Sequence, residues 1–192
     1  MTDEELIRGC IKQDRSAQRM LYEQYFGKMM GICIRFSKNN VDARDIFQNA
    51  FRNIFANPKS FLDENTSRKK DSPPLLPEDW IKKIIIRSAV EHLHKNKKEY
   101  FVSSTVNVRD AEKTSSEEIS DEQIMNKANI QFILKALQQL TPSYRAIYNL
   151  HEVDGYSHKE ISALLDISEY TSKDSLSKAK FNMRRNLARM TR

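Results

Sequence analysis

Apolar residues recur at helical spacing through much of the chain, and the segment from Asp42 to Phe55 shows this spacing most clearly. Its apolar positions lie three or four residues apart, so they line one face of a helix. They are Ala43, Ile46, Phe47, Ala50, Phe51, Ile54 and Phe55. Polar side chains occupy the opposite face. This pattern predicts an amphipathic helix whose apolar face packs into a core.

Similar spacing predicts further helices on both sides of this segment. A capping box formed by Thr2 and Glu5 begins a short helix, and a longer second helix ends near Asn39-Asn40. Two more helices are expected over Trp80–Lys98 and Glu122–Leu140. The whole pattern predicts an all-α fold.

Two stretches interrupt the helical pattern. Asn57–Asp79 is polar and contains several prolines, which remove backbone donors, so it is expected to form a loop. Residues 103–122 are rich in Ser, Thr and acidic residues and contain no aromatic residue, which is typical of a linker. We therefore predict two small helical modules, residues 1–99 and 123–192, joined by a flexible acidic linker over residues 100–122.

The C-terminal module contains three short helices that carry their own start and stop signals. These signals are Thr141-Pro142 and Asp154-Gly155 for the first helix, the Ser157/Glu160 capping box and the Asp166-Ile167 turn for the second, and Ser168 for the third, which runs to about Arg189. A short helix, a tight turn and a longer helix predict a helix-turn-helix.

The last helix is strongly basic, since Asp174 is the one acid among residues 170–192. This charge suits a recognition helix in the DNA major groove, although a solvated basic helix would show the same composition. The candidate base-contacting residues are Tyr170, Thr171, Ser172 and Ser175, the candidate phosphate-contacting residues are Lys173 and Lys178, and Lys180 is a further candidate for contact with the same DNA.

Composition narrows the function classes further. The chain has 192 residues, 39% of them hydrophobic, and a net charge of +6, which modestly favours a polyanionic partner. Cys10 and Cys33 lie within apolar helical patterns, so structural thiols in a reducing compartment are expected. An acidic, polar N-terminus and the lack of a long apolar run predict a cytoplasmic protein without membrane insertion.

The C-terminal module resembles the DNA-binding domain of bacterial RNA polymerase sigma factors of the extracytoplasmic-function (ECF) group. The resemblance covers about fifty residues, from Leu137 onwards. The matching residues are Leu137, Leu140, Pro142, Arg145, Gly155, Tyr156, Ser157, Glu160, Ile161, Leu165, Ile167, Ser168, Thr171 and Lys173. This resemblance implies that the module reads the upstream promoter element.

A second, independent motif supports the same family. The segment D-A-R-D-I-F-Q-N-A-F, which begins at Asp42, is similar to a signature of sigma-factor N-terminal domains, with Arg44 in place of the usual acid. In that family this helix docks on the clamp coiled coil of core RNA polymerase. The resemblance implies that Asp45, Gln48 and Arg52 bind core polymerase.

The helix predicted from Trp80 resembles the family's promoter-melting helix. Basic residues beside an aromatic ring suit single-stranded DNA, and the candidates for downstream promoter DNA are Trp80, Lys83, Arg87, His94 and Lys95. This chain departs from the family pattern at Arg87, Glu91 and His94. The bases that are read are therefore not inherited from the resemblance.

Enzyme chemistry has little support in the sequence. The four histidines show no ligand spacing with the two cysteines, and no glycine-rich phosphate loop or nucleophile elbow is present. No catalytic residue, metal or cofactor is therefore expected. Asp42 and Asp45 share a helix face, which leaves a nuclease as a minor alternative.

The resemblance implies a sigma initiation factor whose partners are core RNA polymerase, promoter DNA and an anti-sigma protein. Two alternatives stay open. One is a helix-turn-helix regulator that acts without core polymerase, and the other is a degenerate sigma-like protein that titrates polymerase.

Overall fold

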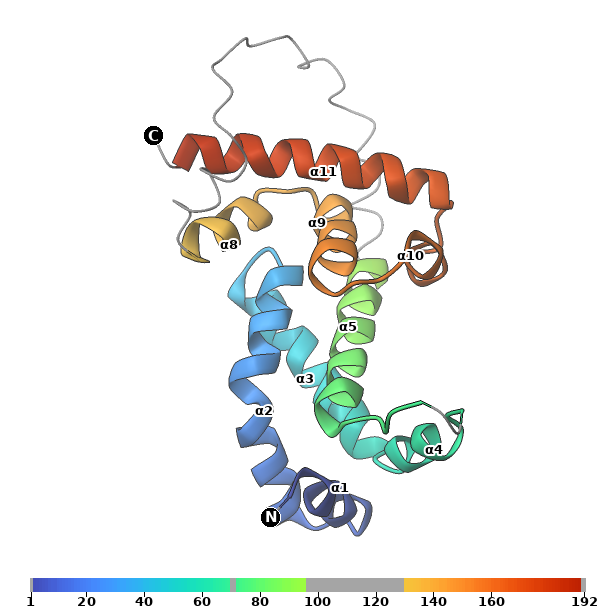
Figure 1. Cartoon of the computed structure of the whole chain (residues 1–192). Coiled ribbons are helices and arrows are strands. Elements are labelled where there is room, and N and C mark those ends of the chain that lie inside the picture. Colours follow the sequence, from blue (N-terminus) through green and yellow to red (C-terminus); the bar gives the residue numbers. More distant parts are fainter. Residues whose placement is uncertain (1, 70–71, 96–129, 191–192) are drawn as a thin grey trace. The chain divides into compact units, whose positions relative to one another are not determined.

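The computed structural model describes residues 2–69, 72–95 and 130–190 of the chain. Within these ranges all regular secondary structure is helical, which confirms the predicted all-α fold for the described residues (Figure 1). The chain divides into two compact units, one formed by Met1–Ile34 and Asn40–Ala89 and the other by Arg35–Asn39 and Val90–Arg192. The predicted linker, residues 100–122, lies outside the described residues.

The first unit begins with helix α1 (Asp3–Ile11), which packs on helix α2 (Arg15–Phe36). The predicted capping box is present, because Thr2 and Glu5 each accept a hydrogen bond from the other's backbone N–H, at 3.2 and 2.8 Å. Asp3 accepts a hydrogen bond from the Tyr25 hydroxyl of α2. Gly9 faces Ala17 so closely that an added methyl group would clash with the Ala17 side chain. The two helices therefore dock through a polar contact at one end and close backbone approach at the other.

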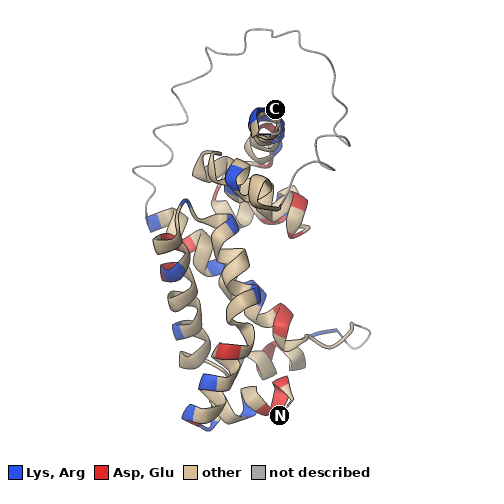
Figure 2. Cartoon of the chain, turned by 90° about the vertical axis from the view of Figure 1, so that its left-hand side faces the viewer, with Lys and Arg blue, Asp and Glu red and all other residues tan. Residues whose placement is uncertain are grey.

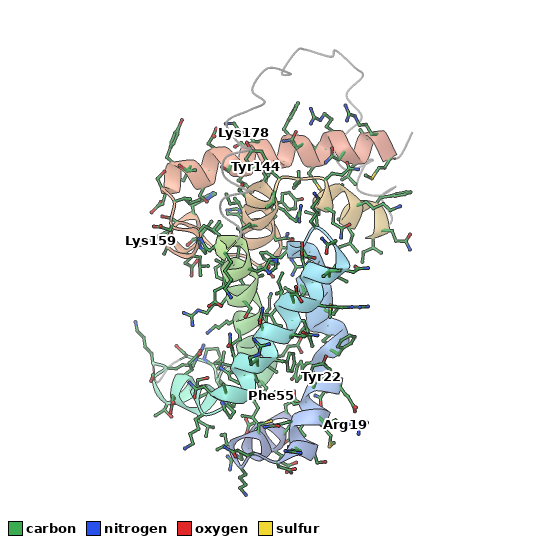
Figure 3. The ribbon with its side chains drawn as sticks, turned by 180° about the vertical axis from the view of Figure 1, so that it is seen from behind. Arg19, Tyr22, Phe55, Tyr144, Lys159 and Lys178 are labelled. Atoms are coloured by element: carbon green, nitrogen blue, oxygen red, sulfur yellow. The ribbon has the colours of Figure 1, made fainter. Side chains whose placement is uncertain are left out.

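An aromatic cluster joins α2 to helix α3 (Asn40–Ala56), which contains the predicted amphipathic segment. Tyr22 and Phe26 of α2 make edge-to-face contacts with the Phe47 ring of α3, with ring centroids 5.2 Å apart in both pairs. Along α3, Phe47 and Phe51 stack at 4.6 Å. The apolar stripe of α3 is buried as predicted, and Phe55 continues the aromatic row at its end (Figure 3).

The predicted loop over Asn57–Asp79 proved partly wrong, because it contains helix α4 (Ser60–Thr66) and the first turn of helix α5 (Pro77–Lys95). Phe61 of α4 is buried against the Trp80 ring of α5, with centroids 5.6 Å apart. The Asn65 side chain then ties the following segment down, since its Oδ1 accepts from the Leu75 N–H at 2.8 Å. A single buried aromatic residue in a polar stretch was too weak a periodic signal to predict this helix.

Helix α5 begins at Pro77, three residues before the predicted start at Trp80. Proline is favoured in the first turn of a helix, where its missing N–H costs nothing. Glu78 and Asp79 follow in the same turn and complement the positive end of the helix dipole. The predicted end of this helix at Lys98 lies outside the described residues.

The second unit contains helices α8 (Ile130–Gln138), α9 (Pro142–Tyr148), α10 (His158–Leu165) and α11 (Glu169–Met190), with a π-helical turn, η2 (Asn149–Val153), after α9. Residues 122–129 of the helix predicted from Glu122 lie outside the described residues. The core of the second unit is built mainly from one face of α8 and one face of α11. This core consists of Ala136, Leu137, Leu140, Ala179, Met183 and Leu187.

A buried arginine organises the junction between α8 and α9. Arg145 of α9 is 2% exposed and donates to three carbonyl oxygens at the end of α8: its Nε to Leu137 at 3.1 Å, and its Nη2 to Gln138 at 3.1 Å and Leu140 at 2.8 Å. The last carbonyls of a helix have no partner within the helix. A fixed cation that satisfies them also complements the negative end of the helix dipole.

Candidate nucleic-acid interface

Helices α10 and α11 form the predicted helix-turn-helix. The Ser157/Glu160 capping box begins α10, with the Ser157 N–H donating to Glu160 at 2.8 Å. The turn is closed by Asp166, whose φ of 55° reverses the chain, and by Ser162, whose hydroxyl donates to the Ile167 carbonyl at 2.7 Å. Ser168 then accepts from the Thr171 N–H at 3.0 Å and caps α11. These caps hold α10 and α11 at a defined mutual orientation.

The inner face of α11 packs on the rest of the unit. Its buried residues recur three or four positions apart and include Ser172, Ser175, Leu176, Ala179, Met183, Asn186 and Leu187. Ser172 and Ser175 are buried on this face, so the structure does not place them on the exposed surface of α11 with the other predicted DNA-contacting residues. Ser172 instead contacts the His158 ring, with its Oγ 2.9 Å from Nδ1. Ser172 and Ser175 precede the buried residues Leu176 and Ala179 by four positions each. Residues four apart share a helix face, so both serine side chains point toward the core.

The outer face of α11 is exposed and rich in cations and donors. Tyr170 is 80% exposed, and Thr171, Lys173 and Lys178 are also exposed. Lys178 projects from α11 in Figure 3, and basic residues also mark the end of this helix in Figure 2. We call the exposed side of α11 the outer face. Its members are Tyr170, Thr171, Lys173, Asp174, Ser177, Lys178, Phe181, Arg184 and Arg185.

Two outer-face residues, Ser177 and Phe181, were missed by the sequence reasoning. Phe181 is 60% exposed although it is a large apolar residue. Both residues follow Tyr170 at seven and eleven positions, which is two and three helical turns. Extending the helical period from Tyr170 would have found them.

Lys180 lies to one side of the outer face and forms an ion pair with Glu152 at the protein surface. Its Nζ is 2.9 Å from the Glu152 carboxylate, which also lies 2.8 Å from the His151 ring. Partial burial alone would raise the pKa of Glu152, but hydrogen bonds from Lys180 and His151 outweigh it and lower that pKa. Lys180 therefore contributes less free positive charge to the interface than predicted.

Two histidines link η2 to α10. The His151 and His158 rings stack with centroids 4.5 Å apart. Burial lowers the pKa of His158, and the charges of His151 and Lys173 lower it further. At neutral pH the imidazole of His158 is therefore held uncharged between its neighbours.

The residues predicted to bind core polymerase share an exposed face of α3. Asp45, Gln48 and Arg52 are all exposed, opposite the buried apolar stripe. Arg52 also donates to Asn49 Oδ1 at 3.0 Å, which aligns its guanidinium along the helix. The structure thus brings these three residues together on one accessible surface.

The residues predicted to contact downstream DNA differ in their exposure. Lys83, Arg87 and Lys95 are exposed along α5, and His94 is half-buried in its last turn. Trp80 is 1% exposed, so the prediction that its ring offers a stacking surface does not agree with this structure. The indole packs on Phe61, and the nearby α5 residues Ile81 and Ile85 are buried as well.

Two features of the described residues bear on other chemistries. No cluster of three or more His, Cys, Asp or Glu side chains suited to holding a metal ion occurs among the described residues. Within the same residues, no helix is long and apolar enough to cross a membrane.

A helix-turn-helix whose second helix exposes cations and hydrogen-bond donors is the arrangement of many DNA-binding domains. A family model described as "Sigma-70, region 4" matches residues 130–180, which include α8 to α10 and the first half of α11.

Curated relatives extend the match to nearly the whole chain. The chain is 24% identical to the ECF RNA polymerase sigma factor SigW of Bacillus subtilis, over 96% of this chain and 98% of that protein. It is 25% identical to the ECF RNA polymerase sigma-E factor of Escherichia coli K12, over 94% of this chain and 91% of that protein.

A solved structure shares the fold. The sigma factor RpoE of Bartonella quintana, solved in complex with the anti-sigma factor NepR, is 18% identical and matches with a TM-score of 0.50, covering 88% of this chain and 96% of that chain. The chain is therefore similar over nearly its whole length to RNA polymerase sigma factors of the ECF group, and residues 130–180 match their region 4.

Proposed function

We propose that the protein binds core RNA polymerase and directs it to specific promoters. The observation that carries this proposal is the outer face of α11, where cations and donors face outward from a capped helix-turn-helix. In this proposal residues 1–99 bind core polymerase and the downstream element, residues 123–192 read the upstream element, and residues 100–122 connect them.

The upstream element is read by the first turns of α11. Tyr170 and Thr171 lie near its N-terminus, where recognition helices contact base edges. Lys173 supplies a phosphate contact that positions the helix on the duplex, and Lys178 can add one when it leaves its ion pair with Asp174. Ser172 and Ser175 are buried on the inner face of α11, which packs on the rest of the unit.

Core polymerase binds the exposed face of α3 that carries Asp45, Gln48 and Arg52. Support comes from the similarity of this segment to the sigma-factor signature and from the exposure of all three side chains. Their mixed charge suits an interface with a charged coiled coil, because opposite charges on two surfaces guide their association.

Melted downstream DNA is bound along α5 by Lys83, Arg87 and Lys95. Lys83 pairs with Glu64 of α4 at 3.3 Å, and both side chains are about half exposed, so this ion pair can exchange for a phosphate contact. Trp80 is buried and packs α5 against Phe61 of α4. His94, at the end of the helix, is a further candidate for the same strand.

An anti-sigma protein is the proposed regulatory partner. The solved relative from Bartonella quintana was captured with its anti-sigma factor NepR, and it shares the fold of this chain over most of its length. A protein that acts with polymerase in this way works in the cytoplasm.

Transcription with purified components tests the proposal. The full chain is mixed with core RNA polymerase and genomic promoter fragments, and the 5′ ends of the transcripts are mapped. Defined starts that share an upstream and a downstream element are the expected result.

The two alternatives predict different results in this experiment. Polymerase binding without defined starts would favour a protein that titrates polymerase. DNA binding without polymerase binding would favour an independent regulator and would contradict the role of the α3 face.

A further inference from the structure

Asp174 is an unusual residue on the outer face of α11. It is the one acidic residue between Tyr170 and Arg192, and its side chain is 44% exposed. A carboxylate on a surface that meets DNA repels the phosphates, and so lowers affinity for every sequence. An acid at this position therefore needs a compensating interaction with the protein or with a base.

The carboxylate of Asp174 is held by Lys178, one turn further along α11. The Nζ of Lys178 lies 2.7 Å from Oδ2 of Asp174. The acid precedes the lysine by four residues, which is the favourable orientation for such a pair on a helix. Both side chains stay about half exposed, so the pair presents an acceptor and a donor side by side to whatever α11 contacts.

The position of the pair decides which part of DNA it meets. Asp174 lies in the second turn of α11, on the same side as Tyr170 and Ser177 and opposite the buried Ala179. The N-terminal turns of a recognition helix lie deepest in the major groove, where base edges are exposed. An ionised carboxylate only accepts hydrogen bonds, and in this groove the exocyclic amine of cytosine offers a donor that suits it.

We propose that Asp174 is a specificity-determining residue that accepts a hydrogen bond from the N4 amine of a cytosine in the upstream element. The inference rests on the proposed function, since it requires α11 to bind duplex DNA. Lys178 orients the carboxylate and offsets its repulsion of the phosphates. The pair lowers general affinity for DNA and increases discrimination at one base pair.

Substitutions at Asp174 separate these two effects. Asp174→Ala removes the acceptor and releases Lys178 to contact a phosphate, so preference for cytosine is lost while affinity for all duplexes rises. The slope of log K against log[salt] then steepens by about 0.9, the value for one further phosphate contact. Asp174→Asn keeps the size of the side chain but adds a donor, and an amide pairs best with adenine.

The experiment selects binding sites from a duplex library of randomised sequence, using the full chain bound to core RNA polymerase. Wild type is expected to prefer cytosine at one position of its selected site by about tenfold, the discrimination typical of one good base contact. Asp174→Asn is expected to move that preference to adenine, and Asp174→Ala to abolish it.

Glu23→Ala is the matched control. Glu23 of α2 forms the same kind of pair with Arg19, at 2.8 Å and with both side chains exposed, far from α11 in sequence. This variant changes the net charge by the same amount and is expected to keep the wild-type preference. Thermal unfolding by circular dichroism checks that all variants are folded.

The possible results distinguish this proposal from the function on which it rests. If Asp174→Ala raises affinity equally for all sequences and the selected site stays unchanged, Asp174 is only a charge on the surface and the proposal is wrong. If wild type selects no sequence at all, the proposed function fails first, and this inference fails with it.

Discussion

At the scale of single residues, Gly9 and Gly31 are glycines in helices with opposite surroundings. A methyl group at Gly9 would collide with the Ala17 side chain, whereas nothing lies within 4 Å of the same position at Gly31. Gly9→Ala is therefore expected to lower the free energy of unfolding by about 1–3 kcal/mol through overpacking. Gly31→Ala is expected to raise it by about 0.5–1 kcal/mol, because alanine favours the helix. Urea unfolding followed by circular dichroism measures both, and equal effects would contradict the close packing of α1 on α2.

Arg145 is a second residue whose role depends on its surroundings. Arg145→Met keeps the length of the side chain but removes the donor to the carbonyls of Gln138 and Leu140, and leaves the Leu137 carbonyl with the Leu140 N–H alone. Unsatisfied buried acceptors are costly, so the second unit is expected to lose about 2–4 kcal/mol of stability. Arg185→Met on the exposed outer face should change stability by less than about 0.5 kcal/mol.

Hydrogen exchange of the α8 amides locates the effect of Arg145→Met. These amides should exchange faster in this variant than in wild type or in Arg185→Met, because the end of α8 loses its cap. Unchanged protection of α8 would contradict the capping role of Arg145.

At the scale of elements, the contacts of His158 link the stability of the helix-turn-helix to pH. Its pKa is lowered, so the unfolded chain takes up a proton before the folded chain does, and stability falls as pH drops below the ordinary value of 6.5. The pKa of Glu152 is also lowered from its ordinary value of 4.5. Stability therefore falls further as the pH drops below that value, because protonation of the Glu152 carboxylate breaks its ion pair with Lys180.

Thermal melting between about pH 7.5 and pH 5 tests this linkage, since that range covers the titration of histidine. The melting temperature of wild type should fall with pH more steeply than that of His158→Gln, in which position 158 does not titrate. Equal slopes for wild type and His158→Gln would rule out His158 as the source.

At the scale of the whole molecule, two similar lysines on α11 are expected to contribute differently to DNA binding. Lys173 is exposed on the outer face, while Lys180 is paired with Glu152. Lys173→Ala should therefore reduce the slope of log K against log[salt] by about 0.9, and Lys180→Ala should reduce it by less. Fluorescence anisotropy of a labelled promoter duplex, titrated with the polymerase-bound protein at several salt concentrations, compares them. A larger effect of Lys180→Ala would contradict the assigned outer face.

The two proposed interfaces should also be separable by mutation. Asp45→Lys reverses a charge on the exposed face of α3 and is expected to weaken binding to core polymerase at least tenfold, the effect of about 1.4 kcal/mol at an interface. Lys173→Ala should leave that affinity unchanged. Pull-down of core polymerase by each tagged variant gives the comparison. A loss of polymerase binding in Lys173→Ala would show that the two functions are not independent.

The sequence by itself determined the helical class, the capped boundaries of the helix-turn-helix and the resemblance to ECF sigma factors, because caps, periodicity and motifs are local signals. Tertiary structure alone decided which way particular side chains face. Ser172, Ser175 and Trp80 have side chains that suit DNA contacts, yet packing against neighbouring helices buries all three. Phe181 is apolar and yet exposed, and Lys180 is basic and yet paired with Glu152. Such outcomes depend on residues distant in the chain that fill the space beside a helix, and local periodicity carries no information about them.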